Sequence, residues 1–124
     1  MFEITTDPRR HLVRIKLSGM MSVDDVAELY RQEHVAIRAM RCPVGQHVLL
    51  IDSTQNELQT QDVIAAFKGE LSRPTRARRI AVVTGQSLSR MQARRLLTDQ
   101  PGMIFATEAE AEAWLFSEKV DKAA

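Results

Sequence analysis

The stretch HVLLIDSTQ, residues 47–55, decides the fold of this chain. Its first half, residues 48–51, is an unbroken apolar run, and the run ends in the carboxylate of Asp52 followed by two hydroxyl side chains. Such a run is typical of a central parallel strand whose two faces are both covered by helices. Ligands and partners meet open α/β sheets at the carboxyl ends of the strands. We therefore expect Asp52 and a polar loop over residues 53–61 to be the first candidates for function.

An antiparallel hairpin is expected before this strand. Phe2 and Ile4 alternate with polar residues, and after a turn signal at residues 7–8 a second alternation follows, with Val13 and Ile15 facing the core. The hairpin ends at a glycine, and helical periodicity replaces the alternation.

Four helices are expected from apolar spacing and from capping residues. Ser22 and Asp25 form a capping-box start for a helix that runs to about residue 40, where Pro43 stops it. Thr60 is the expected N-cap of a second helix, which is closed by Pro74.

The rest of the chain repeats the alternation of strand and helix. A second buried strand is expected at residues 80–84, and the following helix starts at Ser87 or Ser89. A short strand at residues 103–105 and a final helix capped by Thr107 complete the order β-β-α-β-α-β-α-β-α. This order predicts a single α/β domain with one mixed sheet of roughly five strands and about four helices.

Composition limits the classes of protein. The 124 residues, 44% of them hydrophobic, are enough for one domain, which we place at residues 1–117 with a frayed tail at 118–124. A formal charge of +1 argues against nucleic-acid binding, and no segment is apolar enough for membrane insertion. Because Cys42 is the only cysteine, a cytoplasmic location fits better than an oxidising compartment.

The segments LSGMMSVDDVAELY, HVLLID, RRIAVVTG and IFATEAEAEAWL, taken together, resemble SpoIIAA-like or STAS domains, which include anti-sigma-factor antagonists and the cytoplasmic domains of sulphate transporters. The chain is most similar to the small stand-alone bacterial branch described as STAS/SEC14-like. The resemblance extends from Phe2 to about Leu115. It implies a regulatory or binding domain without catalytic chemistry of its own.

The chain departs from this family at one important motif. Signalling members carry a phosphorylatable Asp-Ser-Ser/Thr-Gly at the start of the helix after the central strand, whereas residues 58–62 read LQTQD here. Thr60 is the only candidate phosphoacceptor at that helix start, and its hydroxyl is more simply explained as a cap. The Asp-Ser-Thr of residues 52–54 lies directly after the strand and is followed by Gln55 instead of Gly. Regulation by a kinase is therefore not supported by the motif.

Two candidate functional sites can be named, and the residues of each also have a purely structural explanation. A partner surface over the 52–62 loop would use Asp52, Ser53, Thr54, Thr60 and Asp62, although Asp52 is also a good Asx-turn residue. An anion site would use Gly85, Ser87, Arg90 and Arg94, because amides at a helix start are backed there by guanidinium groups. The same arginines are also explained as a solvated surface.

An apolar pocket of SEC14 type is the alternative function that the resemblance raises. Its candidate lining residues are more simply explained as core: Met20, Met21, Tyr30, Phe67, Met91, Met103 and Phe105. No spacing of histidines or cysteines suggests a metal, and no phosphate-loop, dinucleotide or GxSxG motif suggests a cofactor or an enzyme.

We therefore expect a non-catalytic cytoplasmic module that contacts an unidentified protein and forms a homodimer. A carrier or sensor of a small apolar or anionic ligand is the alternative, and a small hydrolase is the third possibility.

Overall fold

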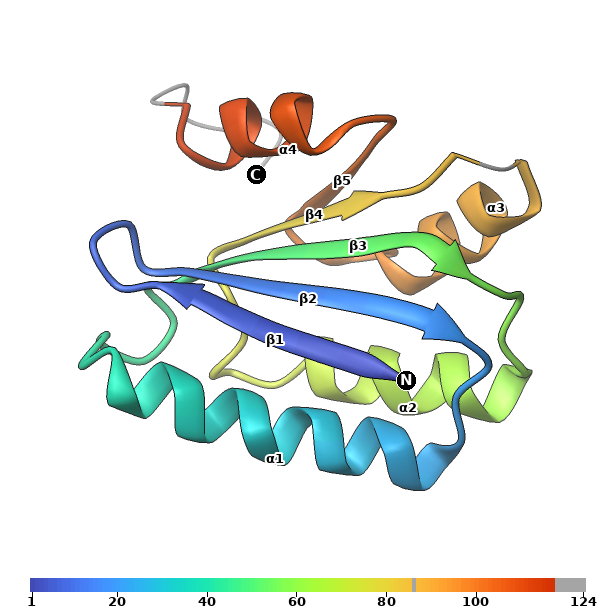
Figure 1. The fold of residues 1–124 in the computed structure, drawn as a ribbon, viewed down its shortest axis with the longest axis horizontal. Helices are drawn as coiled ribbons and strands as arrows, with labels where there is room; N and C mark the ends of the chain where they lie inside the picture. Colours follow the sequence, from blue (N-terminus) through green and yellow to red (C-terminus); the bar gives the residue numbers. More distant parts are fainter. Residues whose placement is uncertain (86, 118–124) are drawn as a thin grey trace.

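The computed structural model describes residues 1–85 and 87–117, which form one five-stranded sheet with four helices (Figure 1). The strands are β1 (Phe2–Asp7), β2 (Leu12–Gly19), β3 (Val48–Asn56), β4 (Arg79–Val83) and β5 (Gly102–Phe105). The helices are α1 (Val23–Ala39), α2 (Gln61–Leu71), α3 (Ser87–Leu96) and α4 (Glu108–Leu115). The strands lie in the order β1-β2-β3-β4-β5, and only β1 runs antiparallel to its neighbour. The predicted fold class and element order are confirmed. The predicted frayed tail lies outside the described residues.

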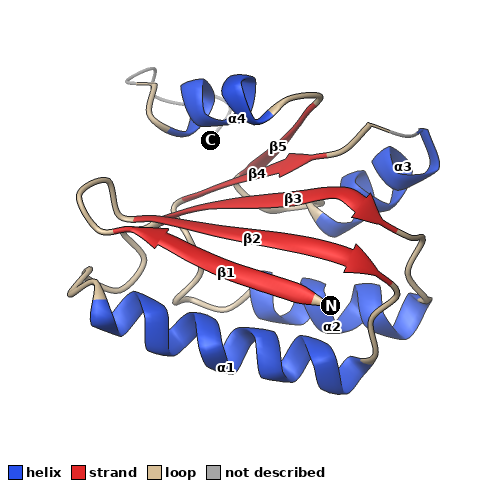
Figure 2. Cartoon of the chain, in the orientation of Figure 1, coloured by secondary structure: helices blue, strands red, loops and turns tan. Residues whose placement is uncertain are grey.

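The two faces of the sheet are covered unequally (Figure 2). Helices α1, α2 and α3 cover one face, whereas α4 lies on the opposite face, over β3, β4 and β5. Leu49 and Ile51 point into the larger core under α1 to α3, while Val48 and Leu50 point into the smaller core under α4. Because successive side chains of a strand alternate between faces, a strand buried on both sides must be apolar throughout. The central position predicted for residues 48–51 is therefore confirmed.

Local capping sets the starts of two helices as expected. The Ser22 hydroxyl accepts from the Asp25 amide at 3.1 Å, and the Asp25 carboxylate accepts from the Ser22 amide at 2.8 Å, which makes a complete capping box. At α4 the Thr107 hydroxyl accepts from the Glu110 amide at 3.2 Å. The start of α3, which the sequence left open, is Ser87.

The prediction of a polar loop over residues 53–61 is wrong for its first half, because β3 continues to Asn56. The end of β2 supplies the partner backbone, with Ser18 opposite Gln55 and Gly19 opposite Asn56 after a shift in register. The actual loop starts at Glu57. No helix in the described part of the chain is long and apolar enough to cross a membrane.

Candidate functional site

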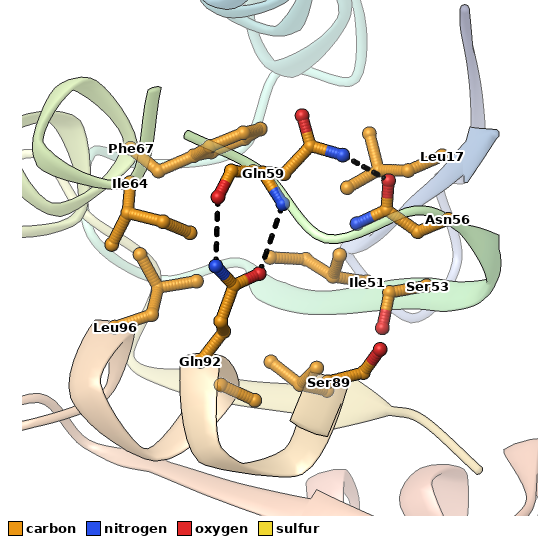
Figure 3. Close-up of a pocket in the computed structure, with 12 residues that line it drawn as sticks. Leu17, Ile51, Ser53, Asn56, Gln59, Ile64, Phe67, Ser89, Gln92 and Leu96 are labelled. Carbon is orange, nitrogen blue, oxygen red and sulfur yellow. Dashed lines mark hydrogen bonds between the residues drawn. The ribbon is translucent and has the colours of Figure 1, made fainter. Parts of the chain in front are cut away.

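The carboxyl ends of β2 and β3 are joined by the side chain of Gln59, which is only 6% exposed. Its Oε1 accepts from the Met21 amide at 2.8 Å. Its Nε2 donates to the carbonyl of Gly19 at 3.0 Å, to Oδ1 of Asn56 at 2.6 Å and to the carbonyl of Glu57 at 2.7 Å. Figure 3 shows the amide between these segments. The loop after β2 and the loop after β3 are therefore held as one unit.

Helix α3 is attached to the same unit by a second amide side chain. The backbone N–H of Gln59 donates to Oε1 of Gln92 at 3.0 Å, and Nε2 of Gln92 donates to the backbone carbonyl of Gln59 at 2.8 Å (Figure 3). The Gln92 side-chain amide thus accepts one hydrogen bond from the Gln59 backbone and donates another to it, and this pair fixes the position of α3 against the loop. Sequence reasoning missed the roles of both glutamines, since neither Gln59 in a polar loop nor Gln92 on a helix carries a local signal of its bonding partner.

The cavity beneath this unit is small. Its volume is about 40 Å³, and Leu17, Ile51, Phe67 and Leu96 are among the residues that line it (Figure 3). Sites for drug-sized ligands measure roughly 300–1,000 Å³. A space of this size has room for very few solvent molecules and not for a lipid chain.

The seven side chains considered for an apolar pocket do not line one cavity. Met20, Met91 and Met103 are exposed, and Met21 and Tyr30 belong to the core under α1 to α3. Phe105 lies on the other face of the sheet, where its ring is 5.7 Å from that of Trp114. Of the seven, only Phe67 contributes to the small cavity. Their arrangement supports the interpretation as core and surface residues.

Asp52, Ser53 and Thr54 lie within β3 and therefore alternate between the two faces of the sheet. Oδ1 of Asp52 accepts from the Thr54 amide at 3.0 Å and from the Thr54 hydroxyl at 2.7 Å, so the carboxylate makes the Asx-type bond that we considered. Ser53 points to the opposite face, is buried, and donates to the carbonyl of Val83 at 2.9 Å. These three residues therefore do not form one surface with each other.

Thr60 and Asp62 lie together at the start of α2. Thr60 is the N-cap residue as predicted, but the expected capping bond from its hydroxyl to the backbone is absent. The hydroxyl instead donates to the carboxylate of Asp62, which also accepts from the Val63 amide at 3.0 Å. An ionised carboxylate is a stronger acceptor than a hydroxyl, which explains the exchange of roles. The Thr60 hydroxyl bond holds the pKa of Asp62 below its usual value.

The predicted anion site lies at the exposed start of α3. Gly85, Ser87, Arg90 and Arg94 are all exposed, and the four-residue spacing of the two arginines places them on the same side of the helix. Gln86, between the first two residues, lies outside the described residues. No three His, Cys, Asp or Glu side chains in residues 1–85 and 87–117 are placed to hold a metal ion.

Large apolar side chains are exposed around the unit that Gln59 and Gln92 tie together. We call these side chains, with the nearby polar residues Thr60, Asp62, Arg90 and Arg94, the carboxyl-end surface. The apolar members and their exposed fractions are Met20 (54%), Val23 (43%), Leu58 (44%), Leu88 (59%) and Met91 (51%). They come from the β2–α1 connection and the start of α1, the β3–α2 loop, and α3, which Figure 1 places at the same end of the sheet.

No family model matches the sequence, and no curated protein matches it. Among solved structures, an uncharacterised protein of the DUF3478 family with a SpoIIAA-like fold from Shewanella loihica PV-4 superposes with a TM-score of 0.69 at 18% identity, covering 93% of this chain and 92% of that one. An anti-sigma factor antagonist from Mycobacterium paratuberculosis gives a TM-score of 0.59 at 15% identity, covering 94% of this chain and 96% of that one. The chain therefore has the SpoIIAA-like, or STAS, fold that the sequence resemblance implied.

Proposed function

We propose that this SpoIIAA-like domain is a non-catalytic regulatory module of the cytoplasm that binds a protein partner through the carboxyl-end surface. One observation carries the proposal: five large apolar side chains, each 43% exposed or more, project from three segments that Gln59 and Gln92 hold together. Scattered apolar residues are normal on protein surfaces, whereas a group around one rigid unit is typical of an interaction site.

The polar neighbours of this apolar group suit an interface as well. Asp62 lies at one side, at the start of α2, and Arg90 and Arg94 lie on α3. An apolar centre with a charged rim is the usual anatomy of a protein interface. Phosphate on Thr60 would add close to two negative charges beside Asp62, so modification there would change binding by repulsion. The name of one structural neighbour, an anti-sigma factor antagonist, is compatible with a regulatory contact.

The small-ligand alternative has weaker support at this end of the sheet. The cavity under Gln59 measures about 40 Å³, which is too small for an apolar cargo. The predicted anion site at Gly85 and Ser87 is exposed and belongs to the edge of the same surface, where its arginines are equally available to acidic groups of a partner.

Site-directed photo-crosslinking in the native host tests the proposal. A photoreactive residue at Leu88 is expected to capture one discrete protein, and Leu58→Asp is expected to abolish the capture. The control position is Val44, which is 71% exposed and lies before β3, away from the carboxyl-end surface. Capture of the same proteins at Leu88 and Val44 would refute the proposal. Capture of a second copy at Leu88 would identify the partner as the predicted homodimer.

A further inference from the structure

The opposite end of the sheet, between α1 and α2, contains a cluster of buried polar side chains. Tyr30 is 4% exposed, Glu33 is 5% exposed and His47 is 2% exposed. Together with Glu70 and His34 they surround a small inner space of about 10 Å³. A volume of this size holds about one water molecule, or one group of similar size.

Several atoms of this cluster have no hydrogen-bond partner within the described part of the chain. They are Oη of Tyr30, Oε2 of Glu33, Nδ1 of His47 and Oε1 of Glu70. Buried polar atoms are nearly always hydrogen-bonded, because burial without a partner forfeits their hydration. Four such atoms around one space leave hydrogen-bonding capacity that a water molecule or a ligand group of that size would meet.

A larger cavity of about 330 Å³ adjoins the inner space. His34, His47 and Thr75 line both, so the two are neighbours. We call the two spaces together the amino-end cavity. The larger part is also lined by two arginines, Arg38 and Arg73, of which Arg73 pairs with Glu70. Its volume lies at the lower end of the range for small-molecule sites, roughly 300–1,000 Å³.

The inner space is rich in acceptors: two carboxylates, Glu33 and Glu70, line it, with Arg76 as the one arginine among its lining residues. Burial, with the nearby Glu70 carboxylate, raises the pKa of Glu33 to about 7, while burial lowers the pKa of His47 to about 4 and keeps the imidazole neutral. Glu33 makes no ion pair in the described residues, whereas Glu70 pairs with Arg73 at 3.3 Å. A primary ammonium group has three donors and no acceptor, which matches the unpartnered oxygens of Tyr30, Glu33 and Glu70.

We propose that the amino-end cavity binds a small zwitterionic molecule, with its primary ammonium group in the inner space between Tyr30, Glu33 and Glu70 and its anionic group beside Arg38 and Arg73. One buried water is the rival occupant of the inner space. A water would satisfy some of the same atoms, but it would give the Glu33 carboxylate no counter-charge and would not use the outer arginines.

Titration of the intact protein with defined probes separates these occupants. Glycine, β-alanine and γ-aminobutyrate carry both charged groups with a growing spacer, whereas butyrate and n-butylamine each carry one. At least one of the zwitterions is expected to shift the backbone amide signals of His34 and His47 in NMR spectra, and to bind more tightly than either single-charge probe. Binding at pH 7 is expected to release about half a proton from Glu33, measured by calorimetry in two buffers of different ionisation enthalpy.

Two pairs of variants locate the charged groups of the ligand. Glu33→Gln is expected to weaken the zwitterion about tenfold or more and to remove the proton release, because a charge-assisted hydrogen bond is lost. Glu28→Gln, the same change at a partly exposed position of α1 outside the cavity, should leave both unchanged. Arg38→Gln should weaken the zwitterion but not n-butylamine, with Arg31→Gln as its control.

Three results would overturn the proposal. If no zwitterion shifts the His34 and His47 signals, the inner space holds only water. If butyrate binds as tightly as γ-aminobutyrate, the ammonium assignment is wrong. If Glu33→Gln and Glu28→Gln behave alike, the probes bind elsewhere. Because this cavity lies at the opposite end of the sheet from the carboxyl-end surface, these results are independent of the crosslinking at Leu88.

Discussion

The two ends of the sheet satisfy their polar groups in opposite ways. At the carboxyl end the buried amide of Gln59 bonds to four other residues, and the side chains left exposed are apolar. At the amino end Glu33 and His47 are buried with unpartnered atoms beside an open cavity. At the carboxyl end the buried amide of Gln59 has its hydrogen-bond partners, and the exposed apolar surface is available to a protein. At the amino end several buried polar atoms lack partners among the described residues, and the cavity beside them is available to a small molecule.

The difference follows from what each end places next to its polar side chains. Loops meet at the carboxyl end, and their backbone groups are still available for a side-chain amide to bond. The amino-end cluster lies between α1 and α2, where helical backbone groups already bond to each other. Oε2 of Glu33 therefore finds no partner on either helix, and the nearby Glu70 carboxylate repels the Glu33 charge.

The largest expected effect comes from Gln59→Leu at the carboxyl end. The substitution removes the bonds that join two loops, leaves the Met21 amide without its partner, and leaves the Gly19 carbonyl with only the Glu57 amide as donor among the described residues. We expect the free energy of unfolding to fall by about 3 kcal/mol, since each lost buried bond costs about 1 kcal/mol and orphaned groups cost more. Urea denaturation measures it. Gln55→Leu, at an exposed site on β3, should change stability by less than about 0.5 kcal/mol. An equal loss of unfolding free energy in Gln59→Leu and Gln55→Leu would show that the Gln59 side chain does not hold the two loops together.

Predictability from the sequence differs between the two ends as well. The apolar run of β3 and the capping box of Ser22 and Asp25 were predicted correctly, because each depends on residues a few positions apart. The extension of β3 to Asn56 was missed, since it depends on pairing with Gly19, which is distant in the chain. The exchange of the Thr60 cap for a bond to Asp62 was missed because two acceptors compete at that helix start.

The amino-end cluster had a signal that went unused. Glu33 follows Val26, Leu29 and Tyr30 at helical spacing, so it occupies a position on the buried face of α1. A carboxylate at such a position is unusual and suggests a special environment. Its neighbours Glu70 and His47 come from α2 and the segment before β3, and only the tertiary fold brings these three together. The two carboxylates that line the space could not be predicted from any one stretch.

Glu33→Gln tests the amino end. Its expected effect on the free energy of unfolding is smaller than that of Gln59→Leu, and it stabilises the fold where Gln59→Leu destabilises it. The folded-state pKa of Glu33 is about 7, above the ordinary value of 4.5, so its contribution to stability is fully present below pH 4.5 and is lost as pH rises to 7. We expect Glu33→Gln to raise the free energy of unfolding at pH 8 by about 2 kcal/mol, and to have little effect near pH 4.5. Urea denaturation across this range measures it, with Glu28→Gln as the control.

His47 makes this pH profile more informative. Its folded-state pKa of about 4 lies below the ordinary 6.5, so its stabilising contribution is present above pH 6.5 and is lost as pH falls towards 4. Between pH 4.5 and 6.5 the contributions of Glu33 and His47 therefore change in opposite directions. Glu33→Gln should make stability rise more steeply with pH in that window than it does in the unmodified protein. An unchanged slope would contradict the burial of the Glu33 charge.

Leu88→Asp is expected to have the smallest effect on stability and the clearest effect on contact. Leu88 is 59% exposed on α3, so the change should alter the free energy of unfolding by less than about 0.5 kcal/mol. A charge in the centre of an apolar interface is costly to bury, so partner capture from a photoreactive residue at Leu58 should be lost. Val44→Asp is the matched change outside this surface. A folded Leu88→Asp protein that still captures its partner would show that the exposed apolar side chains do not form the interface, although Gln59 holds them together.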